Sequence, residues 1–276
     1  MTFGVVTVNY NNANLTRNLI ESLAQRGGVE HFEIVVVDNA SQEEDRKLLQ
    51  EVQNDHPWVR LVMSNDNVGY FPGLNLGIEL LRNETKPVNT IIVCNNDIEF
   101  PAEFFQTLEN LAADTLSKFP IISPSIVTPL GRHQNPHVIS HISTLRYLVW
   151  RIYYSNYTLA RIIHRLAIAT ASATARRDCE QFYTGRIIDQ GYGACYILTP
   201  MFFRHYEKLW APTFLMGEEF FLSRQIRAIG SSVYYDPRIR VTHLDHRTVG
   251  TLPEKEIWEI ARQSFKTYRV YKDYYG

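Results

Sequence analysis

Two groups of polar residues, far apart in the chain, have side chains that are suited to catalysis. One group directly follows an apolar segment and the other follows a glycine; they are Asn95, Asn96 and Asp97, and Glu218 and Glu219. A carboxylate at a strand end, such as Asp97, can hold Mg²⁺ or Mn²⁺ against substrate phosphates. One member of an acidic pair can act as a general base, because adjacent carboxylates repel each other and move a pKa toward neutrality. The two groups predict an enzyme that handles a metal-bound anion and removes a proton.

The composition is typical of one large α/β domain with appendages. Of the 276 residues, 45% are hydrophobic and 21% are charged, which is enough apolar surface for a sizeable core. The net charge of -1 creates no global field that would attract nucleic acid, so we expect no nucleic-acid partner. The cysteines, Cys94, Cys179 and Cys195, are odd in number and lack zinc-site spacing. They argue against a disulfide framework and against a structural metal site.

The sequence carries no recognisable export or membrane-spanning signal. It runs directly into the apolar segment 3–8 without a basic region before it. No segment approaches the ~18 consecutive apolar residues that a membrane-spanning helix needs. We therefore expect a cytoplasmic protein.

Apolar strands and amphipathic helices alternate in the first part of the chain. Strands are predicted at 5–8, 34–37, 60–63 and 90–94, with helices at 15–24, after Ser41, and around 74–81. Asn14 is the predicted N-cap of the first helix, and Ser41 and Glu44 have capping-box spacing for the second. Continuous apolar strands that alternate with helices favour a mostly parallel sheet covered on both faces. Ligands of such sheets gather at the carboxyl ends of the strands.

Polar residues stand at the predicted carboxyl ends of all four strands. They are Asn9, Asp38, the segment 65–69 and the segment 95–97. Such residues also make turns and caps, which is the structural alternative for each position alone. The turn 9–14 contains no glycine, and the Gly-x-Gly-x-x-Gly, P-loop and Gly-x-Ser-x-Gly motifs are absent. A bound nucleotide diphosphate would therefore need another source of positive charge, and a divalent cation held by Asp97 is the simplest one.

Several segments resemble the family 2 glycosyltransferases with a GT-A fold, especially the bacterial rhamnosyltransferase-like branch. The segments are Val5-Val6-Thr7-Val8-Asn9-Tyr10-Asn11, Val35-Val36-Val37-Asp38-Asn39-Ala40-Ser41, Asn67 to Ile78, Asn95-Asn96-Asp97, Gly193 to Leu198, Phe214 to Arg224 and Asp236 to His243. The resemblance covers roughly residues 3–246, and 67–78 is its most specific part. Asn95 replaces the first acid of the family's Asp-x-Asp element, and Glu219 stands where the family usually has Asp.

The resemblance implies transfer of a sugar, with inversion, from a nucleotide diphosphate sugar to an acceptor hydroxyl. It implies Asp97 and His243 as ligands of Mg²⁺ or Mn²⁺, and Glu219 as the general base, with Glu218 as the alternative. The implied nucleotide-sugar contacts are Thr7, Asn9, Asp38, Asn67, Gly69, Asn75, Asn95 and Asn96, and the implied acceptor side is Gly193, Ala194 and Cys195.

Structural roles remain open for some of these residues. Asn75 can act as an amide bonded to nearby backbone, and Cys195 as a small buried residue. His243 can be a surface or packing residue, and the acidic pair can simply stabilise a helix start through the helix dipole.

An insertion between His141 and Arg177 contains six Arg and no Asp or Glu. Its aliphatic residues recur at helical spacing, which predicts two amphipathic helices within a catalytic domain that spans 1–250. A C-terminal amphipathic helix is predicted within 251–276, again rich in aromatic and basic residues. Such helices suit an anionic lipid interface, where a lipid-linked glycan acceptor would be found. Packing on the domain or formation of a homodimer is the alternative.

The sequence as a whole predicts an inverting, metal-dependent glycosyltransferase. We expect it to use dTDP-rhamnose or a UDP-hexose and to extend a bacterial surface polysaccharide, peripherally at the inner face of the cytoplasmic membrane. A nucleotidyltransferase is one alternative, and it would need a basic phosphate-gripping loop near the first turn. A non-catalytic carbohydrate-binding or scaffold protein is the other, because Asn95 and Glu219 depart from the commonest motif.

Overall fold

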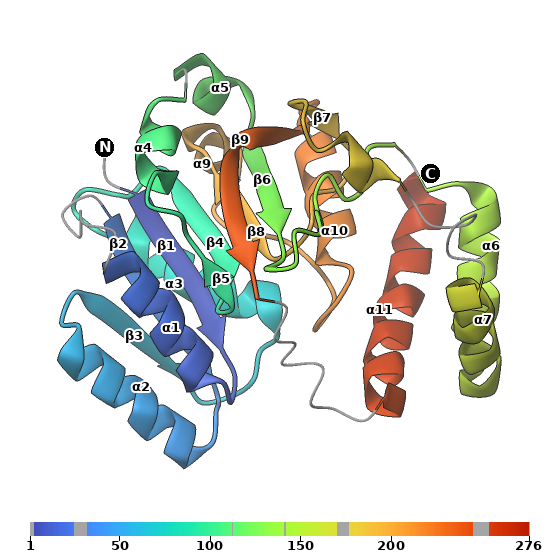
Figure 1. The fold of residues 1–276 in the computed structure, drawn as a ribbon, viewed down its shortest axis with the longest axis horizontal. Helices are drawn as coiled ribbons and strands as arrows, with labels where there is room; N and C mark the ends of the chain where they lie inside the picture. The colour runs from blue at the N-terminus through green and yellow to red at the C-terminus, as the bar shows by residue number, and fades with distance from the viewer. Residues whose placement is uncertain are drawn as a thin grey trace.

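The fold is a nine-stranded sheet with helices on both faces (Figure 1). The computed structural model describes residues 3–24, 32–111, 113–140, 142–169, 177–244 and 254–275. The strand order is β3-β2-β1-β4-β8-β6-β9-β5, and β7 pairs with β9 outside this path. The predicted α/β class with a mostly parallel central sheet is confirmed.

The first part of the chain alternates strands and helices as predicted. Its elements are β1 (Phe3–Asn9), α1 (Ala13–Ala24), β2 (Phe32–Asn39), α2 (Glu43–Asp55), β3 (Val59–Ser64), α3 (Tyr70–Arg82) and β4 (Ile91–Asn95). Strands β3, β2, β1 and β4 are parallel neighbours. Their carboxyl ends therefore meet at one edge of the sheet, which is the lower edge in Figure 1.

Two predicted helix caps are wrong. Helix α1 already begins at Ala13, so Asn14 lies in its first turn. Helix α2 begins at Glu43 after Gln42, and Ser41 lies outside it. The Ser41 hydroxyl instead accepts a hydrogen bond from the backbone N–H of Asn11, at 2.9 Å. A bond between two strand ends has thus replaced the local cap.

The second part of the chain adds antiparallel strands and the remaining helices. Its elements are β5 (Ile98–Glu99), α4 (Phe104–Glu109), α5 (Ala113–Lys118), β6 (Ile121–Val127), α6 (Thr144–Tyr153), α7 (Tyr157–Ala169), the 3₁₀ helix η1 (Asp178–Gln181), β7 (Arg186–Ile188), β8 (Cys195–Leu198), α9 (Pro200–His205), α10 (Glu218–Arg227), β9 (Val233–His243) and α11 (Glu254–Tyr275).

Two of these strands bring distant segments to the carboxyl end of β4. Strand β8 runs antiparallel between β4 and β6, so the turn before it lies beside Asn95. Strand β9 is parallel to β6 and antiparallel to β5, with His243 opposite Ile98. His243 therefore arrives next to Asp97, which directly precedes Ile98.

The core has one layer on each face of the sheet, because side chains of a strand alternate between the two faces. In β2, Ile34 and Val36 pack with apolar residues of α1, α2 and α4. Val35 and Val37 point to the opposite face and pack with residues of α3, α9 and α10. Covering both faces in this way explains why β2 is a continuous apolar run rather than an alternating one.

Helices α6, α7 and α11 form a separate group beside the sheet (Figure 1). Aromatic side chains join them. Tyr154, directly after α6, stacks on Phe265 of α11 at 4.7 Å, and Tyr157 of α7 meets Trp258 edge-on at 5.5 Å. Tyr268 of α11 contacts Phe220 of α10 at 4.3 Å, which ties the group to the rest of the fold. The helices predicted in the insertion and near the C-terminus are confirmed, although 141, 170–176, 251–253 and 276 lie outside the described residues. No helix in the described ranges is long and apolar enough to cross a bilayer.

We expect Gly77→Ala in α3 to destabilise the protein, although alanine has the higher helix propensity by about 1 kcal/mol. A Cβ at Gly77 would lie 2.5 Å from Cγ1 of Val6 in the sheet, so helix and sheet would have to separate. Overpacking of this kind costs roughly 1–3 kcal/mol. Urea denaturation followed by circular dichroism measures the difference. Asn18→Ala on the exposed face of α1 is the matched control, and it should be neutral or stabilising. An unchanged or raised stability of Gly77→Ala would contradict this packing.

Candidate active site

The candidate active site lies where the ends of β1, β2 and β4 meet the turn before β8. Asn9 is in register with Asp38 of β2, and Val8 with Asn95 of β4. The backbone N–H of Asn95 donates to the carbonyl oxygen of Ala194 at 2.9 Å. The structure therefore brings Asn9, Asp38 and Asn95 of the predicted donor side to one sheet edge and places the predicted acceptor-side segment next to them.

A dense polar network surrounds Asn9 and Asp38, both of which are completely buried. The Asn9 amide donates to Asp45 at 2.7 Å and to Asp38 at 3.3 Å. The Arg46 guanidinium donates to the Asp38 carboxylate at 2.8 Å and also bonds the carbonyl oxygen of Ser64. The network satisfies the buried charge of Asp38 and joins the ends of three strands. A direct contact between Asp38 and a nucleotide stays a prediction.

Asn67 and Gly69 shape the loop that leads into α3. The Asn67 side-chain oxygen accepts hydrogen bonds from the Asn39 amide at 2.8 Å and from the Gly69 N–H at 3.1 Å. Gly69 has φ +92°, and a Cβ there would collide with the carbonyl oxygen of Phe214. This close approach brings the start of α3 against the loop that precedes α10. Glycine is required at Gly69 for both reasons.

Asn75 and Asn96 are held by bonds to other parts of the protein. The Asn75 amide donates to the Leu209 carbonyl and accepts from the Leu209 N–H, both at 2.9 Å. This arrangement supports the structural role that the sequence left open for Asn75. Asn96 is buried, and its amide donates to the Thr16 hydroxyl at 3.0 Å. Thr7 is also buried within β1, whereas the Asn95 side chain is half-buried and more accessible.

Asp97 and His243 form a buried pair at the centre of this edge. Oδ1 of Asp97 lies 3.1 Å from Nε2 of His243, and both residues are about 5% exposed (5% and 4%). Nδ1 of His243 lies 2.8 Å from the side-chain oxygen of Gln134. With that oxygen accepting from Nδ1–H, the lone pair of Nε2 faces the carboxylate. Two facing acceptors need a proton or a cation near them, so the pair fits a divalent metal.

This donor set consists of two side chains. Within the described ranges, no three His, Cys, Asp or Glu side chains converge to hold an ion. Oδ1 of Asp97 is buried, and among the described residues no group donates a hydrogen bond to it, although Nε2 of His243 lies nearby. A carboxylate and an imidazole suit Mg²⁺ or Mn²⁺ when substrate phosphates and water complete the coordination.

Glu218 and Glu219 open α10, as predicted, and differ in environment. Glu218 is 5% exposed, and burial, followed by the charge of Glu219, raises its pKa to about 8. Glu219 is half-buried, and its carboxylate lies against the backbone of Gly193. A Cβ at Gly193 would be only 2.6 Å from Oε1 of Glu219. Absence of a side chain at Gly193 thus lets an acidic group reach the predicted acceptor side.

Tyr70 lies near both the Asp97–His243 pair and the acidic pair of α10. Its hydroxyl donates to the carbonyl oxygen of Gly193 at 3.3 Å. Burial raises the pKa of this hydroxyl well above its usual value, and the charges of Glu218 and Asp97 add to the shift. Tyr70 is therefore within electrostatic reach of both acids.

Burial likewise raises the pKa of the Cys195 thiol, which supports a packing role rather than a nucleophilic one.

Three residues of the site were missed by sequence reasoning. Tyr70 lies within the segment 67–78, where only the asparagines and Gly69 were singled out. Arg46 lies eight residues after Asp38, in α2, and belongs to no motif that would have marked it. Gln134 lies in a loop without a recognisable pattern, so no sequence signal could have identified it as the partner of His243.

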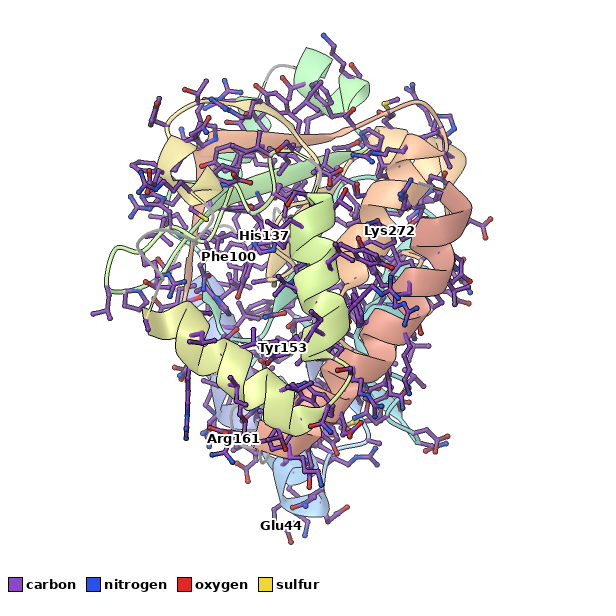
Figure 2. The ribbon with its side chains drawn as sticks, turned by 90° about the vertical axis from the view of Figure 1, so that its right-hand side faces the viewer. Glu44, Phe100, His137, Tyr153, Arg161 and Lys272 are labelled. Atoms are coloured by element: carbon purple, nitrogen blue, oxygen red, sulfur yellow. The ribbon has the colours of Figure 1, made fainter. Side chains whose placement is uncertain are left out.

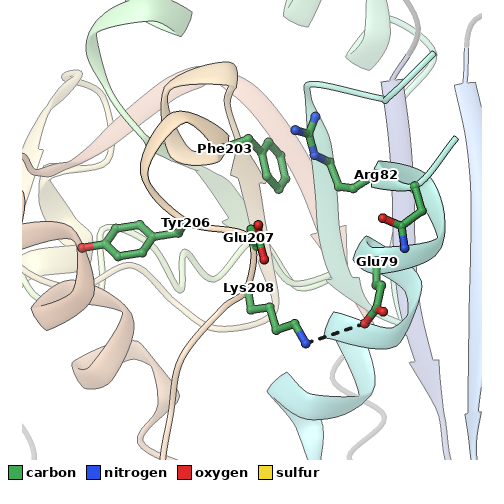
Figure 3. A pocket seen from close by; sticks show the side chains of 7 residues that line it. Glu79, Arg82, Phe203, Tyr206, Glu207 and Lys208 are labelled. Carbon is green, nitrogen blue, oxygen red and sulfur yellow. Dashed lines mark ion pairs between the residues drawn. The ribbon is translucent and has the colours of Figure 1, made fainter. Parts of the chain in front are cut away.

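A surface pocket of about 260 Å³ lies elsewhere, between α3 and the end of α9 (Figure 3). Arg82 stacks over the ring of Phe203 at 4.5 Å, and Lys208 pairs with Glu79 at 3.7 Å. None of the predicted site residues lines it. The pocket is therefore separate from the strand ends.

The fold and the site together define a GT-A-type α/β protein, and the comparisons with known proteins agree. The sequence profile described as glycosyl transferase family 2 matches residues 4–177, more than half of the chain. The chain belongs to glycosyl transferase family 2. The matched region contains Asp97 but ends before Glu218, Glu219 and His243. No curated protein sequence matches the chain.

Two solved structures share the fold. One is GalNAc-T7 with UDP, GalNAc and Mn²⁺, which is 14% identical, with a TM-score of 0.55 over 88% of this chain and 44% of that one. The other is the mannosyltransferase PcManGT from Pyrobaculum calidifontis with GDP-Man and Mn²⁺, 14% identical, with a TM-score of 0.54 over 89% of this chain and 58% of that one. The chain thus spans about half the length of these proteins.

We expect the buried Glu218 to make stability depend on pH. Burial raises the pKa of its carboxyl from the ordinary value of 4.5 to about 8, so the folded protein disfavours the ionised form. Its contribution to stability is complete below pH 4.5 and is lost as the pH rises through about 8. Glu218→Gln should be more stable than the wild type at pH 8 by roughly 4 kcal/mol, and about equal at pH 4.5.

Urea denaturation at several pH values between these limits measures the effect. Glu207→Gln, at an exposed position, is the matched control and should leave the pH dependence of stability unchanged. Parallel pH profiles for Glu218→Gln and the wild type would show that the Glu218 carboxyl is not held protonated.

Proposed function

We propose that the chain transfers a sugar from a nucleotide diphosphate sugar to a hydroxyl of a glycan acceptor, with inversion at the anomeric carbon. The observation that carries the proposal is the buried Asp97–His243 pair, 3.1 Å apart, at the same sheet edge as the acidic pair of α10. Transfer requires a cation that neutralises the diphosphate and a base that deprotonates the acceptor hydroxyl. The Asp97–His243 pair would hold the cation, and the acidic pair would provide the base.

Asp97 and His243 would hold Mg²⁺ or Mn²⁺, which when bound supplies a Lewis acid that stabilises the charge of the leaving diphosphate. Gln134 fixes the ring of His243 through Nδ1, so that Nε2 stays directed toward Asp97. We assign Asn95, as the most accessible of the three residues 95–97, to a direct contact with the donor. Thr7, Asn9, Asn67, Gly69 and Asn96 would support the donor site from the strand ends and loops around it. Asp38 would contact the nucleotide, and Asn75 would hold the neighbouring loop through its bonds to Leu209.

We propose Glu219 as the general base. Burial keeps Glu218 protonated near neutral pH, so repulsion within the pair is relieved and Glu219 is the carboxylate that can accept a proton. Glu219 faces Gly193, next to Ala194 and Cys195, where the acceptor hydroxyl would bind. The hydroxyl proton passes to Glu219 while the acceptor oxygen attacks the anomeric carbon from the side opposite the leaving diphosphate.

For the donor we propose dTDP-rhamnose or a UDP-hexose, and for the acceptor a lipid-linked glycan of a bacterial surface polysaccharide. Support comes from the family assignment and from solved proteins of this fold that were seen with UDP and with GDP-Man. Such an acceptor would place the protein peripherally at the inner face of the cytoplasmic membrane. Residues 1–250 would form the catalytic domain and 251–276 an appended helix.

We expect a nucleotide diphosphate sugar to raise the melting temperature only in the presence of Mn²⁺ or Mg²⁺, and Asp97→Ala to abolish the effect. Ligand at 100 times its dissociation constant stabilises the folded protein by about 2.7 kcal/mol, which raises the melting temperature by roughly 5–10 °C for a chain of this size. Thermal-shift assays with UDP-, dTDP- and GDP-sugars measure it. Asp55→Ala, an exposed acid at the end of α2, is the control and should keep the full shift. An equal shift in Asp97→Ala would remove Asp97 from the metal site.

We expect Glu219→Gln to lower the rate of transfer by 10²–10⁴-fold while donor binding is retained, because only the proton acceptor is lost. Glu218→Gln should lower the rate by less than about tenfold, since this residue is already protonated near neutral pH. Transfer assays with the donor selected by thermal shift measure both variants. The opposite ranking would exchange the two roles. If the wild type binds donor but transfers sugar to no glycan, a carbohydrate-binding protein is favoured. If it transfers the nucleotide instead of the sugar, a nucleotidyltransferase is favoured.

A further inference from the structure

The insertion helices α6 and α7 leave an aliphatic surface exposed. On α6 the residues Leu145, Leu148, Val149 and Ile152 recur every three or four positions and form one stripe; on α7 Leu159 and Ile162 form another. Leu145 is 73% exposed, Ile152 53% and Ile162 50%. We name these six residues the aliphatic surface. Contiguous exposed apolar residues of this kind mark interaction sites in proteins.

The opposite side of α6 is the one that packs within the protein. Tyr147 is buried and lies 6.0 Å from Phe265 of α11, and Lys272 of α11 covers its ring at 3.4 Å. Arg262 of α11 donates to the carbonyl oxygen of Tyr154 at the end of α6, at 3.1 Å. Helix α6 therefore has two apolar faces, of which the aromatic one holds the helix to α11. The aliphatic surface is not needed for that packing.

Positive charge accompanies the aliphatic surface. Residues 141–177 contain six Arg and no acid. Arg151 of α6 and Arg161 and Arg165 of α7 are exposed beside the aliphatic stripes. Figure 2 looks onto this side of the molecule, with Tyr153 and Arg161 on the two helices. A surface that is aliphatic in its centre and basic at its flanks is complementary to a bilayer with anionic headgroups.

We propose that α6 and α7 dock this protein on an anionic phospholipid surface through the aliphatic surface and the flanking arginines. Charge decides between lipid and a second copy of the chain. In a symmetric dimer the same patch of both copies forms the interface, so it would collect Arg151, Arg161 and Arg165 twice without acids of the insertion to neutralise them. Phosphate headgroups offer the opposite charge, and acyl chains accept the leucine and isoleucine side chains to a shallow depth.

Co-sedimentation of the full chain with vesicles tests the proposal. We expect binding to vesicles of phosphatidylcholine and phosphatidylglycerol, weaker binding to phosphatidylcholine alone, and loss of the difference in high salt. Leu148→Glu combined with Ile152→Glu should reduce binding at least tenfold, because both positions are exposed and the charge would enter the interface. Arg151→Gln combined with Arg161→Gln should reduce binding to the anionic vesicles by roughly 5-fold to 25-fold, at about 1 kcal/mol for each basic residue.

The matched control is Leu130→Glu, which places the same charge at a 96% exposed leucine in the loop after β6. It should bind vesicles as the wild type does. Circular dichroism of every variant distinguishes lost binding from lost folding. Failure of the wild type to bind anionic vesicles, or wild-type binding by the two double variants, would overturn the proposal. So would a wild-type dimer in size-exclusion chromatography that Leu148→Glu dissociates, because the surface would then join two copies.

Vesicle binding needs neither donor nor metal. Its failure would therefore leave the proposed transferase activity untouched, and loss of transfer in Asp97→Ala would not affect membrane docking. The two proposals can fail separately.

Discussion

The close approach of Asp97 and His243 is the constraint on which the candidate site depends. A carboxylate and an imidazole nitrogen lie 3.1 Å apart in a place that water hardly reaches. Burying such a pair costs free energy unless a proton or a cation lies between the two groups or beside them. The fold holds the two residues in place through the sheet, with Asp97 between β4 and β5 and His243 at the end of β9. Gln134 then fixes the ring from its far side.

The amides around this pair have a mainly architectural task. Asn9 bonds Asp45 of α2, Asn96 bonds Thr16 of α1, and Asn39 bonds the loop that carries Asn67 and Gly69. Asn75 bonds the backbone of Leu209 in both directions. Side-chain amides can donate and accept at once, so they join loops that have no common secondary structure. The first strand-to-helix turn has no glycine-rich loop whose backbone N–H groups could hold a phosphate, so the charged groups at this edge depend on side chains for their placement. The asparagine-rich strand ends are thus a framework for the acids.

The insertion shows how one helix can have two apolar faces with different tasks. The aromatic face of α6 packs on α11, where stacked rings and the Lys272 ammonium over Tyr147 hold the helices together. The aliphatic face, which hydropathy alone would assign to a core, is left in solvent. The difference depends on which partner each face meets, and that partner is provided by a helix about a hundred residues later in the chain. Because α11 also contacts α10, this helical group is tied to the helix that carries the acidic pair.

The sequence by itself determined the layered fold and the position of the site along the chain. Continuous apolar runs at 34–37 and 90–94 can be buried only as central parallel strands, and polar residues after them must then meet at one edge. Tertiary structure alone decided the roles within that edge. Asn75 bonds the backbone of a residue 134 positions away, and Ser41 bonds Asn11 across the sheet instead of capping α2. Glu218 and Glu219 are identical in type, and only burial distinguishes them. Periodicity reports which face of an element is apolar, whereas hydrogen-bond partners and desolvation depend on contacts between segments that are distant in the sequence.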